Sequence, residues 1–263
     1  MGRNWHPCPP LIECMPTSVL ADTAGMREPP ACLPLRAPFD SLLWLIDLRQ
    51  ADTGHEQVLS VHEQARAARF RFERDARRYR VSHLALRHLL ASALGCLPSA
   101  VVMESGPHGK PHLRGSGYHF NLSHSDDWAL IALHPHHPIG VDLECWHPIS
   151  DWATLAQQNY TPSENEALRA LPADEQALGF LRCWTRKEAC LKALGSGLLI
   201  EPHGFEAGIH PAAARVGVAV PQGGICQMNV VSLDVSAQIG QQPPPLLLGA
   251  LALVEPQAAG LCF

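Results

Sequence analysis

Apolar residues along the chain fall into short runs that predict β-strands. The runs at residues 42–48 and 120–125 predict two strands, and residues 128–133 predict the hairpin partner of the second one. Residues 101–104 predict a strand that is followed by a tight turn at residues 106–111, and residues 139–144 predict a further strand. Residues 246–254 form an apolar run that is too short to span a bilayer and therefore predict a buried strand.

Capping signals mark where helices begin and end. Residues 60–63 and 161–164 both have the spacing of a capping box, so we expect a helix to start at each. Apolar periodicity predicts a longer helix over residues 75–94, with Gly95 as its C-terminal stop. Another helix, in the second half of the chain, should end at Gly195.

The two halves of the chain resemble each other in this pattern. Each offers a helical stretch followed by strands that end in an apolar hairpin, so we predict an α+β fold with a duplicated unit. We expect residues 1–38, which are proline-rich, to form a disordered extension. Residues 39–138 would form the N-terminal half, and residues 139–263 the C-terminal half.

Composition limits the classes of protein that fit. The 263 residues are 46% apolar and carry a formal net charge of −5, which suffices for a core and argues against non-specific nucleic-acid binding. The nine cysteines include no Cys-x-x-Cys pair, which favours reduced thiols. The N-terminus does not have the pattern of a signal peptide. We therefore expect a cytoplasmic protein that binds neither nucleic acid nor a membrane.

Two clusters of ionisable residues leave alternatives open. Seven arginines crowd between residues 66 and 80, where they form either a solvated helix face or a patch for an anionic ligand or partner. His134, His136 and His137 alternate with prolines. We favour a polar loop there over a zinc site, because neither a cysteine pair nor helical histidine spacing supports zinc.

Three carboxylates predict a metal site in the C-terminal half. Asp142 and Glu144 lie two residues apart on one predicted strand, so their side chains share a face. Glu188 lies on the predicted helix, with Lys192 four residues on. Acidic oxygens without histidine or cysteine suit Mg²⁺ better than Zn²⁺.

The positions of the lysines indicate a binding site for phosphate groups. Only Lys110, Lys187 and Lys192 occur in a chain that otherwise uses arginine, which indicates that a compact ammonium is needed at these positions. The segment around Lys110 is not a Walker motif. Ser123 and His124 do not form a nucleophile elbow, and a contact to phosphate suits them better than serine hydrolysis.

Four motifs in this order resemble the 4′-phosphopantetheinyl transferases, and more closely the surfactin-synthetase-activating type. They are Gly109-Lys110-Pro111, then Phe120-Asn121-Leu122-Ser123-His124-Ser125, then Gly140-Val141-Asp142-Leu143-Glu144, and last Trp184 with Lys187-Glu188-Ala189 and Lys192. The resemblance implies a pseudo-dimer of two similar α+β halves. It also implies transfer of 4′-phosphopantetheine from coenzyme A, the co-substrate, to a serine of an apo acyl or peptidyl carrier protein. Adenosine 3′,5′-bisphosphate would be released.

The resemblance also assigns roles to residues. The ligands of Mg²⁺ would be Asp142, Glu144 and Glu188. The residues that bind coenzyme A would be Arg66, Arg78, Lys110, Pro111, Ser123, His124, Asp142, Lys187 and Lys192. Glu188 and Lys192 would be catalytic, with Glu188 as the general base and a metal-bound water as the alternative base. Because the pseudo-dimer is internal, we expect a monomer.

Two hypotheses from other classes stay open on the sequence alone. One is a non-catalytic module that binds coenzyme A or a nucleotide. The other is a Mg²⁺-dependent pyrophosphatase that acts on free nucleotides. Which carrier protein would be modified does not follow from the sequence.

Overall fold

The computed structural model describes residues 30–221, 223–239 and 246–256. Most of the extension expected over residues 1–38 therefore lies outside the described residues. Its last part contains β1 (Cys32–Pro34), which pairs with β2 (Leu42–Asp47). Strand pairing thus begins earlier than the sequence predicts, because a three-residue strand is too short to show alternation of apolar and polar positions.

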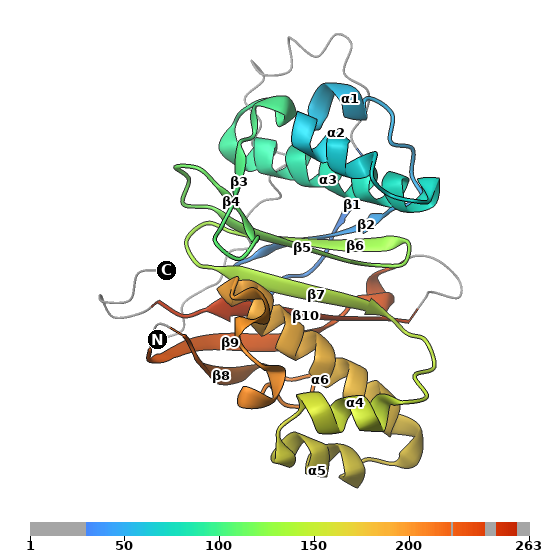
Figure 1. The fold of residues 1–263 in the computed structure, drawn as a ribbon, viewed down its shortest axis with the longest axis vertical. Helices are drawn as coiled ribbons and strands as arrows, with labels where there is room; N and C mark the ends of the chain where they lie inside the picture. Colours follow the sequence, from blue (N-terminus) through green and yellow to red (C-terminus); the bar gives the residue numbers. More distant parts are fainter. Residues whose placement is uncertain (1–29, 222, 240–245, 257–263) are drawn as a thin grey trace, which may run out of the picture. The chain divides into compact units, whose positions relative to one another are not determined.

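Contacts in the described chain gather into two compact units (Figure 1). One contains the described residues of Met1–Ala31 and Leu48–Val101, and the other those of Cys32–Asp47 and Val102–Phe263. The division between halves expected at residues 138 and 139 stays a prediction.

The first unit is helical and is held by a buried ion pair. It contains α1 (His55–Val58), α2 (Val61–Ala67) and α3 (Glu73–Leu94). The predicted capping box of α2 is confirmed, because Glu63 Oε2 accepts from the backbone N–H of Ser60 at 2.8 Å. The same oxygen accepts from Arg87 Nε of α3 at 2.8 Å. One carboxylate thus caps α2 and fastens it to α3.

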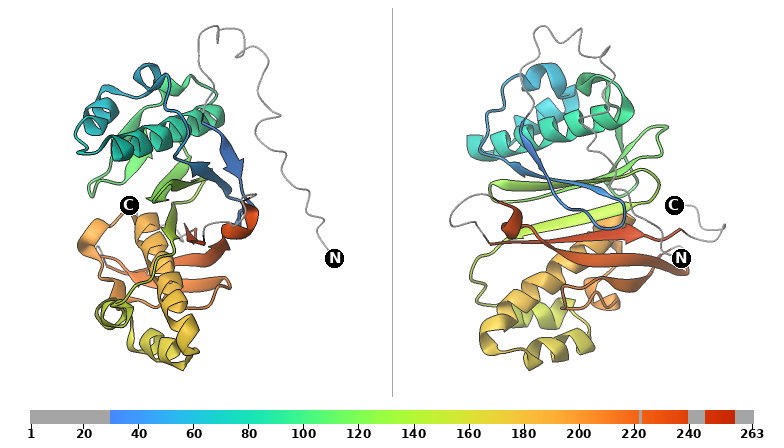
Figure 2. Two further views of the ribbon diagram at one scale, coloured as in Figure 1. Left: turned by 90° about the vertical axis from the view of Figure 1, so that its right-hand side faces the viewer. Right: turned by 180° about the vertical axis from the view of Figure 1, so that it is seen from behind.

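The second unit contains two four-stranded antiparallel sheets, with the strand orders β1-β2-β6-β5 and β7-β10-β9-β8. The remaining strands of these sheets are β5 (His119–Ser125), β6 (Trp128–His134), β7 (Ile139–Cys145), β8 (Ala214–Ala219), β9 (Ile225–Asp234) and β10 (Leu247–Val254). The edge strands β5 and β7 lie side by side (Figures 1 and 2).

The connectivity confirms the predicted α+β fold of two similar halves. In the first half a strand, a 22-residue helix and a hairpin follow one another as β2, α3, β5 and β6. In the second half β7, a 22-residue helix α6 (Ala173–Leu194), β9 and β10 follow in the same order. In each sheet the last strand of the series lies between the other two. Both long helices end at a left-handed glycine, Gly95 with φ 65° and Gly195 with φ 66°.

Two apolar layers enclose the second sheet. One layer joins the two sheets and contains Leu45, Leu130, Val141 and Leu251. The other lies between α6 and the opposite face of β10 and β9 (Figure 2). A Cβ atom at Gly140 would lie 2.1 Å from the Ala189 carbonyl oxygen of α6, so glycine is what permits this close packing of helix on strand.

Several short elements were not predicted. Residues 103–113 form the hairpin of β3 (Met103–Ser105) and β4 (Pro111–Leu113), where we expected one strand at 101–104 and a turn. Helix α4 (Trp152–Asn159) was also missed, because its N-cap residue makes no side-chain hydrogen bond that would mark its start. The predicted capping box of α5 (Pro162–Ala170) is confirmed. None of the helices in the described ranges combines the length and apolar character that a membrane crossing requires.

Candidate active site

The predicted carboxylates lie on the face of β7 that looks toward α6. Alternation along the strand places Asp142 and Glu144 on the same face as Gly140, against which α6 packs. Glu188 and Lys192 lie one helical turn apart on α6. The structure therefore brings together the strand and the helix that carry the predicted metal ligands.

A ladder of short polar side chains on β5 holds β7 in place. Asn121, Ser123 and Ser125 alternate along β5, and their side-chain oxygens accept the backbone N–H groups of β7 at 2.9, 3.3 and 3.0 Å. The N–H groups belong to Val141, Leu143 and Cys145. Because β5 and β7 are edge strands of different sheets, these side chains satisfy N–H groups that would otherwise lack partners.

The same serines orient the carboxylates. Ser123 Oγ donates to Asp142 Oδ1 at 3.0 Å, and Ser125 Oγ donates to Glu144 Oε2 at 2.9 Å. Each serine thus bonds both the backbone of β7 and one acidic side chain. The predictions from sequence missed Ser125, although the spacing of Asn121, Ser123 and Ser125 on one strand face was a detectable signal.

Asp142 is the best buried of the three carboxylates. Its Oδ1 accepts from Lys192 Nζ at 2.5 Å as well as from Ser123. Its Oδ2 is buried and has no hydrogen-bond partner among the described residues. A buried oxygen without a partner is costly, and a cation bound there would remove that cost.

Burial raises the pKa of each carboxyl group, and repulsion by neighbouring carboxylates adds to it for Glu144 and Glu188. Burial is the main cause of the raised pKa of Asp142, against which the Lys192 charge acts. Burial raises the pKa of Glu144, and the charges of Asp142 and Glu188 raise it further. The pKa of Glu188 is likewise raised by burial and then by Asp142. The three carboxyl groups therefore interact electrostatically, and a positive charge near them would stabilise their ionised forms.

These residues fit a hard dication. All the donors are carboxylate oxygens, and Asp142 Oδ2 provides an unpaired anchor. In the described part of the chain, however, the three carboxylates do not each bring an oxygen within 4.8 Å of the other two. The ammonium group of Lys192, which contacts Asp142, supplies positive charge next to these carboxylates.

The chain matches two family models. One, described as the 4′-phosphopantetheinyl transferase superfamily, matches residues 138–217, and the other, described as the N-terminal part of a 4′-phosphopantetheinyl transferase, matches residues 51–136. The 4′-phosphopantetheinyl transferase HetI of a Nostoc species is 41% identical over 163 residues, which cover 59% of this chain and 69% of HetI. The 4′-phosphopantetheinyl transferase psf-1 of Bacillus pumilus is 30% identical over 198 residues, which cover 74% of this chain and 84% of psf-1. This chain belongs to the 4′-phosphopantetheinyl transferase family. A 4′-phosphopantetheinyl transferase of Bacillus subtilis is 28% identical over 167 residues, which cover 63% of this chain and 73% of that relative.

Lys187 of this transferase does not face the carboxylates, which corrects the sequence-based expectation. Its side chain is 1% exposed, and its Nζ donates to Glu164 Oε2 at 2.8 Å and to the carbonyls of Pro202 and Phe205 at 2.8 and 2.5 Å. An ammonium has three N–H groups, so none is left for a phosphate of coenzyme A. Lys187 therefore secures the loop that follows α6.

Glu164, the partner of Lys187, was not singled out from the sequence. It closes the capping box of α5 and accepts through Oε1 from the backbone N–H groups of Ala207 and Gly208 at 2.7 and 3.0 Å. Its capping role was visible in the sequence, but its pairing with Lys187 depends on tertiary contacts.

Ser123 also differs from its expected role as a coenzyme A contact. Its hydroxyl donates to Asp142 and accepts from the Leu143 N–H and from Lys192 Nζ at 3.0 Å. A hydroxyl has one donor and two acceptor positions, so its capacity is used. Ser123 therefore lies beneath the carboxylates as a positioning residue.

The other residues of this unit that we expected to bind coenzyme A have an N–H group left to donate or an exposed side chain. Lys110 Nζ donates to the carbonyls of Ile139 and Ala193 at 3.0 and 2.9 Å, and burial lowers its pKa to about 8. Two of its three N–H groups are thus used. Lys192 likewise uses two and is 31% exposed. Pro111 and His124 are exposed in the same unit.

Arg66 and Arg78 belong to the helical unit. Arg66 is exposed and lies over the ring of Tyr79, 5.7 Å from its centroid. Arg78 Nη1 lies 3.5 Å from an Asp75 carboxylate oxygen. Their assignment to coenzyme A stays a prediction, and so does the choice between a solvated face and an anion patch for the arginine stretch.

The histidine cluster shows one buried member. His134 ends β6, and its Nδ1 accepts the backbone N–H groups of His136 and His137 at 3.1 and 2.9 Å. Burial is the main cause that lowers the pKa of His134 to about 4, and the neighbouring histidines add to it. His134 thus closes a turn, which fits the loop that we expected.

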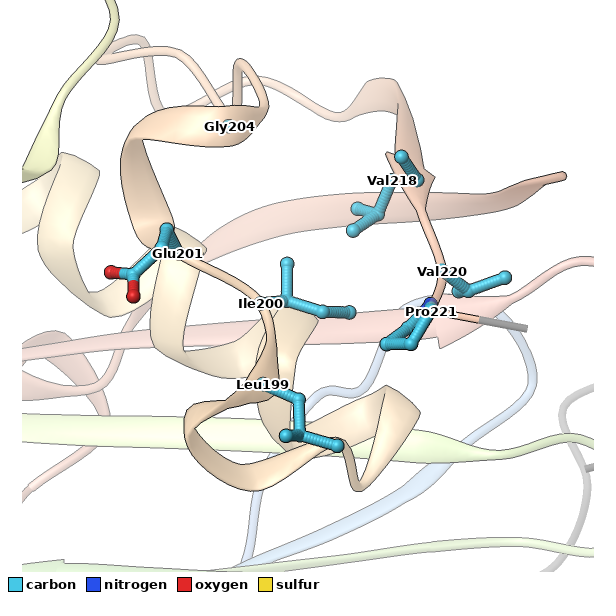
Figure 3. A pocket seen from close by; sticks show the side chains of 8 residues that line it. Leu199, Ile200, Glu201, Gly204, Val218, Val220 and Pro221 are labelled. Atoms are coloured by element: carbon cyan, nitrogen blue, oxygen red, sulfur yellow. The ribbon is translucent and has the colours of Figure 1, made fainter. Parts of the chain in front are cut away.

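None of the three predicted metal ligands, Asp142, Glu144 and Glu188, lines the apolar hollow that follows α6. This hollow has a volume of about 320 Å³, and Ile200, Val218 and Pro221 surround it (Figure 3). Glu201 is the only charged residue that lines it, and no lysine or arginine does. The hollow therefore has no groups that would bind a pyrophosphate, whereas the α6 face of β7 has Lys192.

Proposed function

We propose that this transferase moves 4′-phosphopantetheine from coenzyme A to a serine of an apo acyl or peptidyl carrier protein in a Mg²⁺-dependent reaction. The observation that supports this most is the set of three electrostatically coupled carboxylates with Lys192 at Asp142. The order of the motifs around Lys110, Ser123, Asp142 and Glu188 supports assignment to the surfactin-synthetase-activating type.

The proposed roles follow from charge and hydrogen-bonding capacity. Asp142, Glu144 and Glu188 would hold the metal, which when bound supplies positive charge to the pyrophosphate. The third N–H of Lys192 would donate to a phosphate oxygen of coenzyme A. Lys110 would offer its own remaining N–H to the same substrate.

Proton transfer completes the proposed reaction. The carrier serine oxygen forms a bond to the β-phosphorus, and the bond from that phosphorus to the bridging oxygen breaks. Adenosine 3′,5′-bisphosphate leaves with the bridging oxygen. Glu188, whose pKa is raised by burial, would take the serine proton. A water molecule is the alternative acceptor.

Mass spectrometry of a carrier protein tests the proposal. The enzyme, coenzyme A and Mg²⁺ should add one phosphopantetheine group to an apo carrier, and a chelator should stop the transfer. Glu188→Gln should lose transfer, whereas Glu166→Gln, an exposed change on α5, should keep it. Binding of coenzyme A without transfer to any carrier would favour a non-catalytic module. Hydrolysis of coenzyme A without a carrier would favour a pyrophosphatase.

A further inference from the structure

A second group of potential ligands lies where β5 and β7 both end. Asp126 begins the turn after β5, Cys145 is the last residue of β7, and His147 follows two residues later. One carboxylate oxygen, the Sγ atom and one imidazole nitrogen all lie within 4.8 Å of one another. No other three side chains of these types come so close in the part of the chain that the structure describes.

The polar ladder between the strands explains why these residues meet. Ser125 Oγ accepts the backbone N–H of Cys145 at 3.0 Å, immediately before Asp126. The ends of the two strands are thereby fastened together. Asp126 has φ 50°, so a tight turn determines its backbone direction, and its Oδ2 lies 2.6 Å from His147 Nε2. Cys145 is half-buried, whereas Asp126 and His147 are exposed.

This group is separate from the predicted magnesium ligands. Cys145 shares a strand face with Val141 and Leu143, and it packs on the apolar layer between the sheets. Asp142 and Glu144 point to the opposite face. An ion held by Cys145 would therefore share no ligand with an ion held by Asp142.

The donor set selects a different kind of ion. Thiolate, imidazole and carboxylate together suit Zn²⁺ and similar transition metals, whereas Mg²⁺ prefers oxygen alone. The exposed side of the group leaves a fourth position to water. Binding would displace the thiol proton to solvent.

We propose that Asp126, Cys145 and His147 form a site for a zinc-class transition-metal ion that clasps the turn after β5 to the segment after β7. An exposed Asp126–His147 ion pair beside an uninvolved thiol is the competing explanation. The two differ in one respect, which is whether sulfur contacts a bound metal.

Cobalt spectroscopy on the full chain makes that distinction. The reduced, chelator-treated protein is titrated with Co²⁺ in excess Mg²⁺, so that carboxylate-only sites are occupied. We expect a thiolate-to-cobalt absorption band that saturates at one equivalent and is displaced by Zn²⁺. Cys145→Ser should abolish the band, and His147→Asn should weaken cobalt binding at least tenfold.

Two control variants separate this site from the other cysteines and from the proposed active site. Cys96→Ser, a change in the helical unit, and Asp142→Asn should both keep the band. A missing band in the wild-type protein, or a band that survives in Cys145→Ser, would overturn the proposal. Circular dichroism checks that each variant is folded, and Zn²⁺ should raise the Tm of the wild type but not of Cys145→Ser. Failure of the magnesium-dependent transfer would leave the cobalt result unaffected.

Discussion

Replacement of Lys187 by methionine tests whether this lysine is structural. Methionine keeps an unbranched apolar side chain but removes the ammonium. Glu164, which is 1% exposed, would then lose its charge partner, and the carbonyls of Pro202 and Phe205 would lose their donor. Breaking a buried ion pair by removal of one member costs about 3–5 kcal/mol.

The magnitude is large enough to measure in simple unfolding experiments. For a chain of this size, a loss of 1 kcal/mol lowers Tm by about 2–4 °C. Lys187→Met should therefore lower Tm by roughly 6–20 °C, and urea titration should show the matching loss in the free energy of unfolding. The KM for coenzyme A of the folded protein should stay within about threefold of the wild type, since about 1.4 kcal/mol corresponds to a tenfold change.

A mutant cycle keeps the test decisive if the single variant folds poorly. Glu164→Gln retains an acceptor for the backbone N–H groups of Ala207 and Gly208 but removes the charge. The double variant should be less destabilised than the sum of the single variants, because neither charge is left unpaired. Lys192→Met is the contrasting variant: it leaves the buried Asp142 without its ammonium partner, so it should lose transfer activity as well as stability. A stable Lys187→Met protein with a tenfold higher KM for coenzyme A would refute the reasoning.

Three further predictions concern the α6 face of β7. Ser125→Ala removes the hydrogen bonds to Glu144 and to the Cys145 N–H. It should therefore lower the free energy of unfolding in urea by about 1–3 kcal/mol and raise the Mg²⁺ concentration needed for half-maximal transfer. Ser125→Thr should partly restore the stability and the Mg²⁺ requirement of the wild type. Glu144→Gln should raise Tm in a chelator at pH 8 while it lowers transfer, because the raised pKa of this carboxyl shows that the folded state disfavours its charge. This gain should vanish as the pH falls through the pKa of Glu144, and a gain that persists at pH 3 would contradict the electrostatic explanation. Gly140→Ala should destabilise the protein by several kcal/mol, about the cost of overpacking a core, because its Cβ would lie 2.1 Å from the Ala189 carbonyl oxygen; unchanged thermal unfolding would show that α6 does not pack as described.

The pH dependence that Glu164 and Lys187 give to stability has the opposite sign to that of Glu144. Burial acts to raise the pKa of Glu164, but the charge and hydrogen bond of Lys187 and backbone N–H groups outweigh it, so the net pKa is lowered. A carboxyl with a lowered pKa stabilises the fold above its ordinary pKa, near 4.5, and loses that contribution as the pH falls further. Lys187→Met lacks this contribution, so over that acidic range its free energy of unfolding should fall less than that of the wild type.

Local signals in the sequence were sufficient for most helices and strands. Capping boxes and terminal glycines mark α2, α5, α3 and α6, since a helix end depends on hydrogen bonds within a few residues. The short strands β1 and β4 were missed because their pairing partners, not their own residues, stabilise them. Helix α4 was missed because no capping hydrogen bond marks its start.

The sequence by itself determined the family, the α+β class and the strand face that carries Asp142 and Glu144, since these follow from motif order and from the twofold period of a strand. The four-residue spacing also placed Lys192 on the Glu188 face of the helix. The sequence could not determine that Lys187, on the neighbouring stripe, would be buried away from the carboxylates. The tertiary structure decided this, because α6 packs on β7 at Gly140 while the chain around Phe205 supplies the carbonyls that enclose Lys187. Burial of a charge depends on partners from distant segments, and only the folded chain brings those partners together.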